Sequence, residues 1–290
     1  MVTRRRYRVG LALLLTLSPV VHSQEIMGVV SSSIQTGYVS AYQTVYDSLT
    51  TPPHDTVASA QNTMISSIVS PGTWAKLDVF VFYAQSTNGG GEALINWINP
   101  GTGDASLVGG VTFTANEGIT PNGSTTYSNT NYNPSSDAVQ YTLNSCSIGC
   151  YIRNDIQSGG TVFGARDATA RTVLYPYHTS GDQTFEYINN TSVKNTAVSD
   201  SQGMYIITRT ASDVHTTYKN GSGSSGGQVS NAIPNAVFFV GGTNNSGLSD
   251  EGTWQVACWF AGGGLTESDA NVITNAVETY LDYMGKGVIP

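Results

Sequence analysis

The most informative part of this sequence is WQVACWFAGGGLTESDANVITNAVETYLDYMGKGVI, Trp254–Ile289. The apolar run at its start predicts a buried strand, and three glycines follow it. Thr266 and Asp269 then form a T-x-x-D capping box, and Gly285 ends the pattern. We therefore expect a helix over 266–284. Its apolar side chains recur on one face that can dock on a sheet: Ile273, Ala276, Val277, Tyr280, Leu281 and Met284.

Upstream of this stretch, from Trp74 onward, the hydrophobic pattern has a period of two. LDVFVFYAQ, residues 77–85, predicts a buried strand that is rich in Val and Phe. Further short strands separated by Gly, Pro and Asn turns are expected at Ser147–Arg153, Thr161–Ala165, Arg171–Tyr175, Gly203–Arg209, Val214–Lys219, Ala236–Gly241 and Trp254–Ala261. About ten short strands with regular turns indicate an all-β sandwich or jelly roll rather than a βαβ fold.

The segment 39–72 has helical spacing in two parts. Apolar residues recur one turn apart from Ala41 to Leu49, and Asp55 is placed to cap a second helix that a Ser-Pro-Gly turn ends. We expect this helical pair to pack on a sandwich that occupies residues 73–290.

A signal peptide is predicted at residues 1–23. Its basic start consists of Arg4, Arg5, Arg6 and Arg8. The apolar stretch Val9–Val21 follows, and cleavage is expected near Ser23–Gln24. Because a membrane anchor needs about 20 apolar residues, we predict no transmembrane segment. The mature chain is then secreted or held at the cell surface, and it begins with an exposed N-terminal segment at 24–38.

The charge of the chain excludes one class of partner. Twelve Lys and Arg against twenty Asp and Glu leave a net charge of −8. Removal of four leader arginines leaves 8 basic and 20 acidic residues, a net charge of about −12. An acidic chain without a basic run argues against nucleic-acid binding.

The three cysteines allow one disulfide. Cys146 and Cys150 lie four residues apart in a strand, about 13 Å between Cα atoms, which is too far for a bond. One of them can pair with Cys258. We predict Cys150, because it alternates with Ile148 and Ile152 as Cys258 does with apolar residues of its own strand. The alternative is that all three cysteines are buried and reduced.

Three phrases of the sequence carry a family resemblance: LDVFVFYAQ…EALINWINP, TYSNTNYNPSSDAVQYTLNSCSIGCYIRN and FAGGGLTESDANVITNAVETYLDYMGKGV. They resemble the concanavalin A-like (LamG-type) jelly-roll family, which occurs in phage structural proteins and in bacterial secreted or surface proteins. The resemblance covers roughly residues 39–288 and implies a concanavalin A-like jelly-roll β-sandwich. The fold hosts lectins, glycosidases, adhesion modules and capsid-associated subunits, so it implies little about activity. The predicted leader favours a protein that a cell exports.

No catalytic residues are predicted. Glycosidases of this fold need alternating carboxylates on one strand, and the nearest match, Glu267-Ser268-Asp269, lies in the first turn of the last predicted helix. The serines and histidines suggest no triad order, and the histidines show no zinc-ligand spacing. We therefore expect a protein that is not an enzyme.

Binding is the better-supported class of function. Aromatic residues that can stack on sugars are Trp97, Tyr127, Tyr132, Tyr175 and Tyr177, and each can instead fill the core. Related sandwiches often hold Ca²⁺ near the rim, and the candidate loop acids are Asp104, Asp137, Asp155, Asp167 and Asp250. No other cofactor is expected.

These observations predict an exported, non-enzymatic jelly-roll protein that binds glycan or a cell-surface polysaccharide. The alternative is a structural subunit that self-assembles into an extracellular filament, a homo-oligomer or a virion appendage, with residues 26–34 docking on a neighbour. A glycoside hydrolase of the same fold is a minor alternative.

Overall fold

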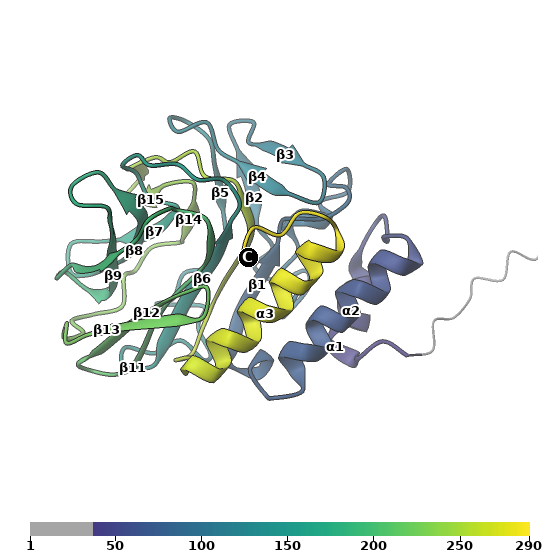
Figure 1. The fold of residues 1–290 in the computed structure, drawn as a ribbon, viewed down its shortest axis with the longest axis horizontal. Helices are drawn as coiled ribbons and strands as arrows, with labels where there is room; N and C mark the ends of the chain where they lie inside the picture. Colours follow the sequence, from purple (N-terminus) through teal and green to yellow (C-terminus); the bar gives the residue numbers. More distant parts are fainter. Residues whose placement is uncertain (1–36) are drawn as a thin grey trace, which may run out of the picture. The chain divides into compact units, whose positions relative to one another are not determined.

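The computed structural model describes residues 37–290. The predicted signal peptide at 1–23 and nearly all of the predicted segment at 24–38 lie outside the described residues. Within 37–290 the chain forms two antiparallel sheets packed as a sandwich, with helices before the first strand and after the last (Figure 1). The predicted fold class, an all-β jelly-roll sandwich with an N-terminal helical pair and a C-terminal helix, is confirmed.

Eight strands form the helix-covered sheet, in the order β13-β12-β11-β6-β17-β4-β3, with β1 also paired to β17. Their bounds are β1 Leu77–Phe82, β3 Thr112–Thr114, β4 Gly118–Thr120, β6 Cys146–Ile152, β11 Gly203–Ala211, β12 Val214–Lys219, β13 Ser222–Gly226 and β17 Val256–Gly262. Every residue of β6 and β17 is buried, because helices cover one face of this sheet and the other sheet covers the opposite face.

Nine strands form the second sheet, in the order β10-β9-β8-β7-β14-β5-β2, with β15 and β16 attached at β7. Their bounds are β2 Ser106–Val108, β5 Tyr127–Asn129, β7 Phe163–Arg166, β8 Arg171–His178, β9 Gln183–Asn190, β10 Lys194–Ala197, β14 Phe239–Val240, β15 Thr243–Asn244 and β16 Leu248–Ser249. Only the β15–β7 pair is parallel among the described strands.

The described helices are α1 Ser40–Ser48, α2 Asp55–Val69 and α3 Glu267–Tyr283, with short 3₁₀ turns η1 Trp74–Lys76 and η2 Glu92–Leu94. The capping box at the start of α3 is formed: the Thr266 hydroxyl accepts the N–H of Asp269, whose carboxylate accepts the N–H of Thr266. Figure 1 shows α2 and α3 side by side on one flank of the sandwich.

Strand β1 illustrates why two separate cores exist. Val79 and Val81 face the core between the sheets, whereas Phe80 and Phe82 face the core beneath the helices. Side chains alternate along a strand, so each apolar residue of this strand is buried on one face or the other. Buried Gln61 of α2 ties the helices together by hydrogen bonds that join α1 and α3.

The glycines that follow β17 allow close approach of main chains. A Cβ atom at Gly262 would overlap the carbonyl oxygen of Lys76, and one at Gly264 would overlap that of Arg209. The Gly263 N–H donates to the Lys76 carbonyl at 2.7 Å. The absence of side chains at these glycines therefore lets the segment between β17 and α3 pack directly against the main chain at Lys76 and Arg209.

The predicted disulfide between Cys150 and Cys258 is not formed. The pairing of β17 with β6 shifts register between Val256 and Cys258, which is a β-bulge. Val256 faces the core between the sheets, but Cys258 faces the helices, while Cys150 lies between the sheets. The two thiols thus lie on opposite faces of one sheet. All three cysteines are free and buried.

Within residues 37–290, no helix combines the length and the apolar character that crossing a bilayer requires.

Candidate functional site: a pocket beside strand β1

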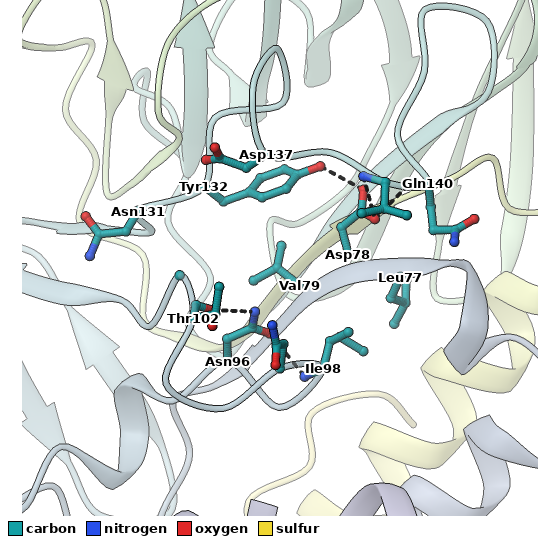
Figure 2. Close-up of a pocket in the computed structure, with 13 residues that line it drawn as sticks. Leu77, Asp78, Val79, Asn96, Ile98, Thr102, Asn131, Tyr132, Asp137 and Gln140 are labelled. Carbon is teal, nitrogen blue, oxygen red and sulfur yellow. Dashed lines mark hydrogen bonds between the residues drawn. The ribbon is translucent and has the colours of Figure 1, made fainter.

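A cavity of about 630 Å³ opens beside the start of β1 (Figure 2). Three segments line it: residues 77–79 of β1, the turn at 96–103 and the loop at 131–140. In Figure 2, Tyr132 lies on one side and the turn with Asn96 and Thr102 on the opposite side, with Val79 between them.

Asp78 holds the wall of the pocket that the 131–140 loop forms. Its carboxylate accepts the N–H groups of Val139 at 3.2 Å, Gln140 at 2.7 Å and Tyr141 at 2.9 Å. It also accepts the hydroxyl of Tyr132 at 2.9 Å. Four donors occupy most of the acceptor capacity of one carboxylate. Asp78 is therefore a positioning residue for the loop.

The opposite wall is held by amide and carboxylate groups in the same way. Asn96 accepts the N–H groups of Phe80 at 3.2 Å and Ile98 at 3.1 Å, and it donates to the Thr102 carbonyl at 3.0 Å. Asp104 accepts the Asn96 N–H at 2.8 Å. The buried polar groups of the pocket are thus engaged with the protein itself.

The free polar groups lie at the rim. The side-chain amides of Asn99 and Gln140 are exposed and make no hydrogen bond with the part of the chain that the structure describes. Asn131 donates to the Asp104 carbonyl at 2.7 Å, which leaves its amide oxygen available. Val139 is 81% exposed beside them. The pocket therefore offers amides and an apolar surface, without a free carboxylate pair.

Only one of the five aromatic residues singled out in the sequence lines this pocket. Tyr132 is 5% exposed, and its ring lies at the pocket wall. Trp97 is 1% exposed and packs on Phe82, with ring centroids 5.4 Å apart, so it cannot stack on a ligand. Tyr177 is buried, and its hydroxyl donates to Asp182.

Tyr127 and Tyr175 lie elsewhere, half-buried on the outer face of the second sheet. Tyr127 packs on Phe239 with ring centroids 4.1 Å apart. The rim residues Asn99 and Gln140 were not predicted from the sequence. Amides are abundant in every loop of this chain, so no spacing marks these two.

The acidic side chains that could suggest catalysis are paired with basic residues. Asp269 accepts from Lys76 at 2.6 Å, and Glu117 bonds Arg153 at 2.9 Å and also Lys286. The Lys286 hydrogen bond outweighs burial and lowers the pKa of Glu117. Burial raises the pKa of Asp269, but the hydrogen bonds from Lys76, Thr266 and Thr73 outweigh it and place that pKa at about 2.

The five candidate calcium-binding acids lie in separate loops. Asp155 accepts the N–H and the hydroxyl of Ser201 at 2.9 and 3.1 Å. Asp167 accepts the N–H and the hydroxyl of Thr169 and the N–H of Ala170. Among residues 37–290, no three His, Cys, Asp or Glu side chains lie close enough together to hold a metal ion.

No family model and no curated protein matches the chain. It is similar to domain 4 of a GH43 extracellular arabinanase from Geobacillus stearothermophilus, solved in complex with arabinotriose, at 16% identity over 69% of this chain and 98% of that one, with a TM-score of 0.45. It is also similar to the botulinum neurotoxin serotype D binding domain, at 13% identity over 71% of this chain and 53% of that one, with a TM-score of 0.49. A mutant of Trypanosoma rangeli sialidase that displays trans-sialidase activity shares 15% identity over 81% of this chain and 39% of the sialidase, with a TM-score of 0.49. The chain thus spans about half of the toxin domain and less than half of the sialidase.

Proposed function

We propose that this chain is an exported, non-enzymatic protein that binds glycan in the pocket beside β1. One observation carries the proposal. The side-chain amides of Asn99 and Gln140 and the amide oxygen of Asn131 have no partner among the described residues at the rim, while the half-buried carboxylate of Asp78 accepts four of the protein's own donors.

The chemistry of the rim suits a neutral sugar. An amide both donates and accepts, so it can bond neighbouring hydroxyl groups of one ring. The exposed side chain of Val139 and the half-buried side chain of Ile98 offer apolar surface to the C–H face of the ring. The volume falls within the range of about 300–1,000 Å³ that is common for small-ligand sites.

The non-enzymatic part of the proposal rests on the acids. Hydrolysis of a glycosidic bond needs one carboxylic acid and one carboxylate beside the same sugar. Asp78 holds a loop, Glu117 is held by Arg153 and Lys286, and Asp269 caps a helix. Export rests on the leader pattern at residues 1–23.

A glycan array on the chain from Gln24 onward tests the proposal, with size-exclusion chromatography of the same preparation. For a neutral glycan that binds, the Asn99→Ala/Gln140→Ala variant should bind about 10- to 30-fold more weakly, because two hydrogen bonds of about 1 kcal/mol each are lost. The Asn275→Ala variant is the matched control, since this amide is exposed on α3 outside the pocket.

Two outcomes would overturn the proposal. One is an array without a hit, and the other is a hit whose affinity the rim variant does not change. Material in the void volume together with an empty array would favour the self-assembling structural subunit instead.

A further inference from the structure

Two arginines of this acidic chain form no salt bridge within the part of the chain that the structure describes. Outside the leader the sequence contains eight Lys and Arg residues. Five of them form salt bridges: Lys76, Arg153, Lys194, Lys219 and Lys286. Arg209 is buried and donates to main-chain carbonyl groups. Arg166 and Arg171 form no salt bridge with any residue from 37 to 290.

These two arginines lie directly opposite each other on adjacent strands. Arg166 of β7 is the cross-strand partner of Arg171 of β8. The neighbouring residue Ala165 faces the core between the sheets, so alternation turns the arginines to the outer face of the second sheet. Like charges in direct cross-strand register destabilise a sheet. The pair therefore costs stability in the absence of an anion.

The nearest acid along the chain does not relieve this repulsion. Asp167 accepts the N–H groups of Thr169 at 2.7 Å, Ala170 at 3.0 Å and Asn235 at 2.7 Å. Burial raises the pKa of Asp167, but these bonds outweigh it and hold the pKa at about 2. Its carboxylate thus closes the β7–β8 turn.

Aromatic side chains lie next to the arginine pair on the outer face of the second sheet. The guanidinium carbon of Arg171 lies 4.1 Å from the ring centroid of Tyr187. Phe185 is the cross-strand partner of Tyr175 and stacks on His178 at 3.9 Å. Figure 1 shows β7, β8 and β9 on the side of the sandwich away from α2 and α3. Two acids lie near the aromatic end of this face: Asp250 contacts the Tyr175 hydroxyl, and Asp182, in the β8–β9 turn, accepts the Tyr177 hydroxyl.

We infer that this outer face binds a carboxylated polysaccharide, with Arg166 and Arg171 as the anion-binding pair. A guanidinium matches a carboxylate with two parallel hydrogen bonds, and the half-buried rings of Tyr175 and Phe185 can pack on sugar C–H faces. Because the chain outside the leader carries 8 basic against 20 acidic residues, the rest of its surface repels a polyanion, so binding localises to the pair. The inference rests on the proposed function only for the sugar nature of the ligand, since it uses different residues.

The test compares polygalacturonate with its fully methyl-esterified form, which has the same backbone without charge. We expect the first to bind and the second not to bind. The Arg166→Gln/Arg171→Gln variant should bind polygalacturonate at least tenfold more weakly. The affinity of the Arg166→Lys/Arg171→Lys variant should lie between those of the unchanged protein and the glutamine variant, because lysine keeps the charge but lacks the planar guanidinium. The Lys76→Gln/Lys286→Gln variant changes the net charge equally at other sites and should retain binding.

Several results would overturn the inference. One is equal binding of the methyl ester, and another is an unchanged affinity of the Arg166→Gln/Arg171→Gln variant whose melting curve shows that it is folded. Binding of poly-L-glutamate or dextran sulfate as tight as that of polygalacturonate would contradict recognition of a carboxylated sugar.

The pocket variant separates this inference from the proposed function. Asn99→Ala/Gln140→Ala should bind polygalacturonate as the unchanged protein does. Loss of binding in this variant alone would place the polysaccharide in the pocket and refute the role of the arginines. Binding of polygalacturonate together with an array that shows no neutral glycan would refute the pocket proposal and leave this inference intact.

Discussion

Asp78 is the residue on which the pocket wall depends, because its carboxylate accepts three main-chain N–H groups and the Tyr132 hydroxyl. Asp78→Asn replaces one acceptor oxygen with an NH₂ group that faces these donors. A hydrogen bond to a charged acceptor contributes about 1.5–3 kcal/mol, and the bonds from Tyr132 and Tyr141 are partly buried, so we expect the free energy of unfolding to fall by about 1.5–3 kcal/mol. Urea denaturation measures the change.

The matched control for this residue is Asp47→Asn on α1. Its carboxylate is exposed and accepts one bond, from Gln43 at 2.8 Å. Such a surface change should stay within about 0.5 kcal/mol. An equally small effect for Asp78→Asn would mean that the loop does not depend on this carboxylate.

At the scale of an element, the β-bulge in β17 decides the state of the cysteines. It places Cys258 beneath the helices while Cys150 stays between the sheets. Burial raises the pKa of Cys146 and of Cys258 to about 12, so their thiols are neither accessible nor ionised at neutral pH. We expect Ellman's reagent to find no reactive thiol in the native protein and three in guanidinium without reductant.

The Cys258→Ala variant makes this measurement decisive. If all three cysteines of the unchanged protein are free, the variant should show two thiols in guanidinium, one fewer than the unchanged protein. If the Cys150–Cys258 bond existed, the unchanged protein would show one thiol and the variant two. A rise on mutation would therefore contradict the strand geometry described above.

At the scale of the whole molecule, a buried polar cluster joins the two sheets. Glu186 of the second sheet accepts Lys194 at 2.9 Å and the hydroxyl of Thr217 from the helix-covered sheet. His215 is fully buried, and its Nε2 lies 3.8 Å from Glu186. Burial, with Lys194 and Arg209 nearby, holds the pKa of His215 well below its usual range. The ring is thus neutral in the folded protein at neutral pH.

This cluster predicts how stability changes with pH. Below about pH 6.5 the unfolded chain binds a proton at His215 and the folded chain does not, so the free energy of unfolding falls as the pH falls. The contribution of this residue approaches about 1.4 kcal/mol per pH unit between pH 6 and its folded pKa. Urea denaturation at pH 7, 6 and 5 measures it.

The His215→Leu variant should show a flatter dependence on pH, because it removes the group that titrates only in the unfolded chain. The Asn275→Ala variant, at an exposed position on α3, removes no titrating group and should keep the slope of the unchanged protein. An identical slope in the His215→Leu variant would mean that other groups set the pH dependence.

Features that depend on neighbours along the chain could be predicted from the sequence. The capping box of Thr266 and Asp269 needs residues three positions apart, and α3 ends at Tyr283, two residues before the predicted stop at Gly285. The period of two from Leu77 to Phe82 predicted a strand buried on both faces, because alternate side chains reach opposite cores. Local spacing was therefore enough for the fold class.

Which side chains line the pocket depends on contacts between segments that are distant in the sequence. Asn99 and Gln140 meet at one pocket because Asp78, distant from both in sequence, holds the loop in place. One extra residue in β17 turned Cys258 to the opposite face, and the Asn96–Asp104 turn placed Trp97 under the helices. Long-range hydrogen bonds and a one-residue register shift leave no periodic signal in a sequence, so the site became visible only when the strands were paired.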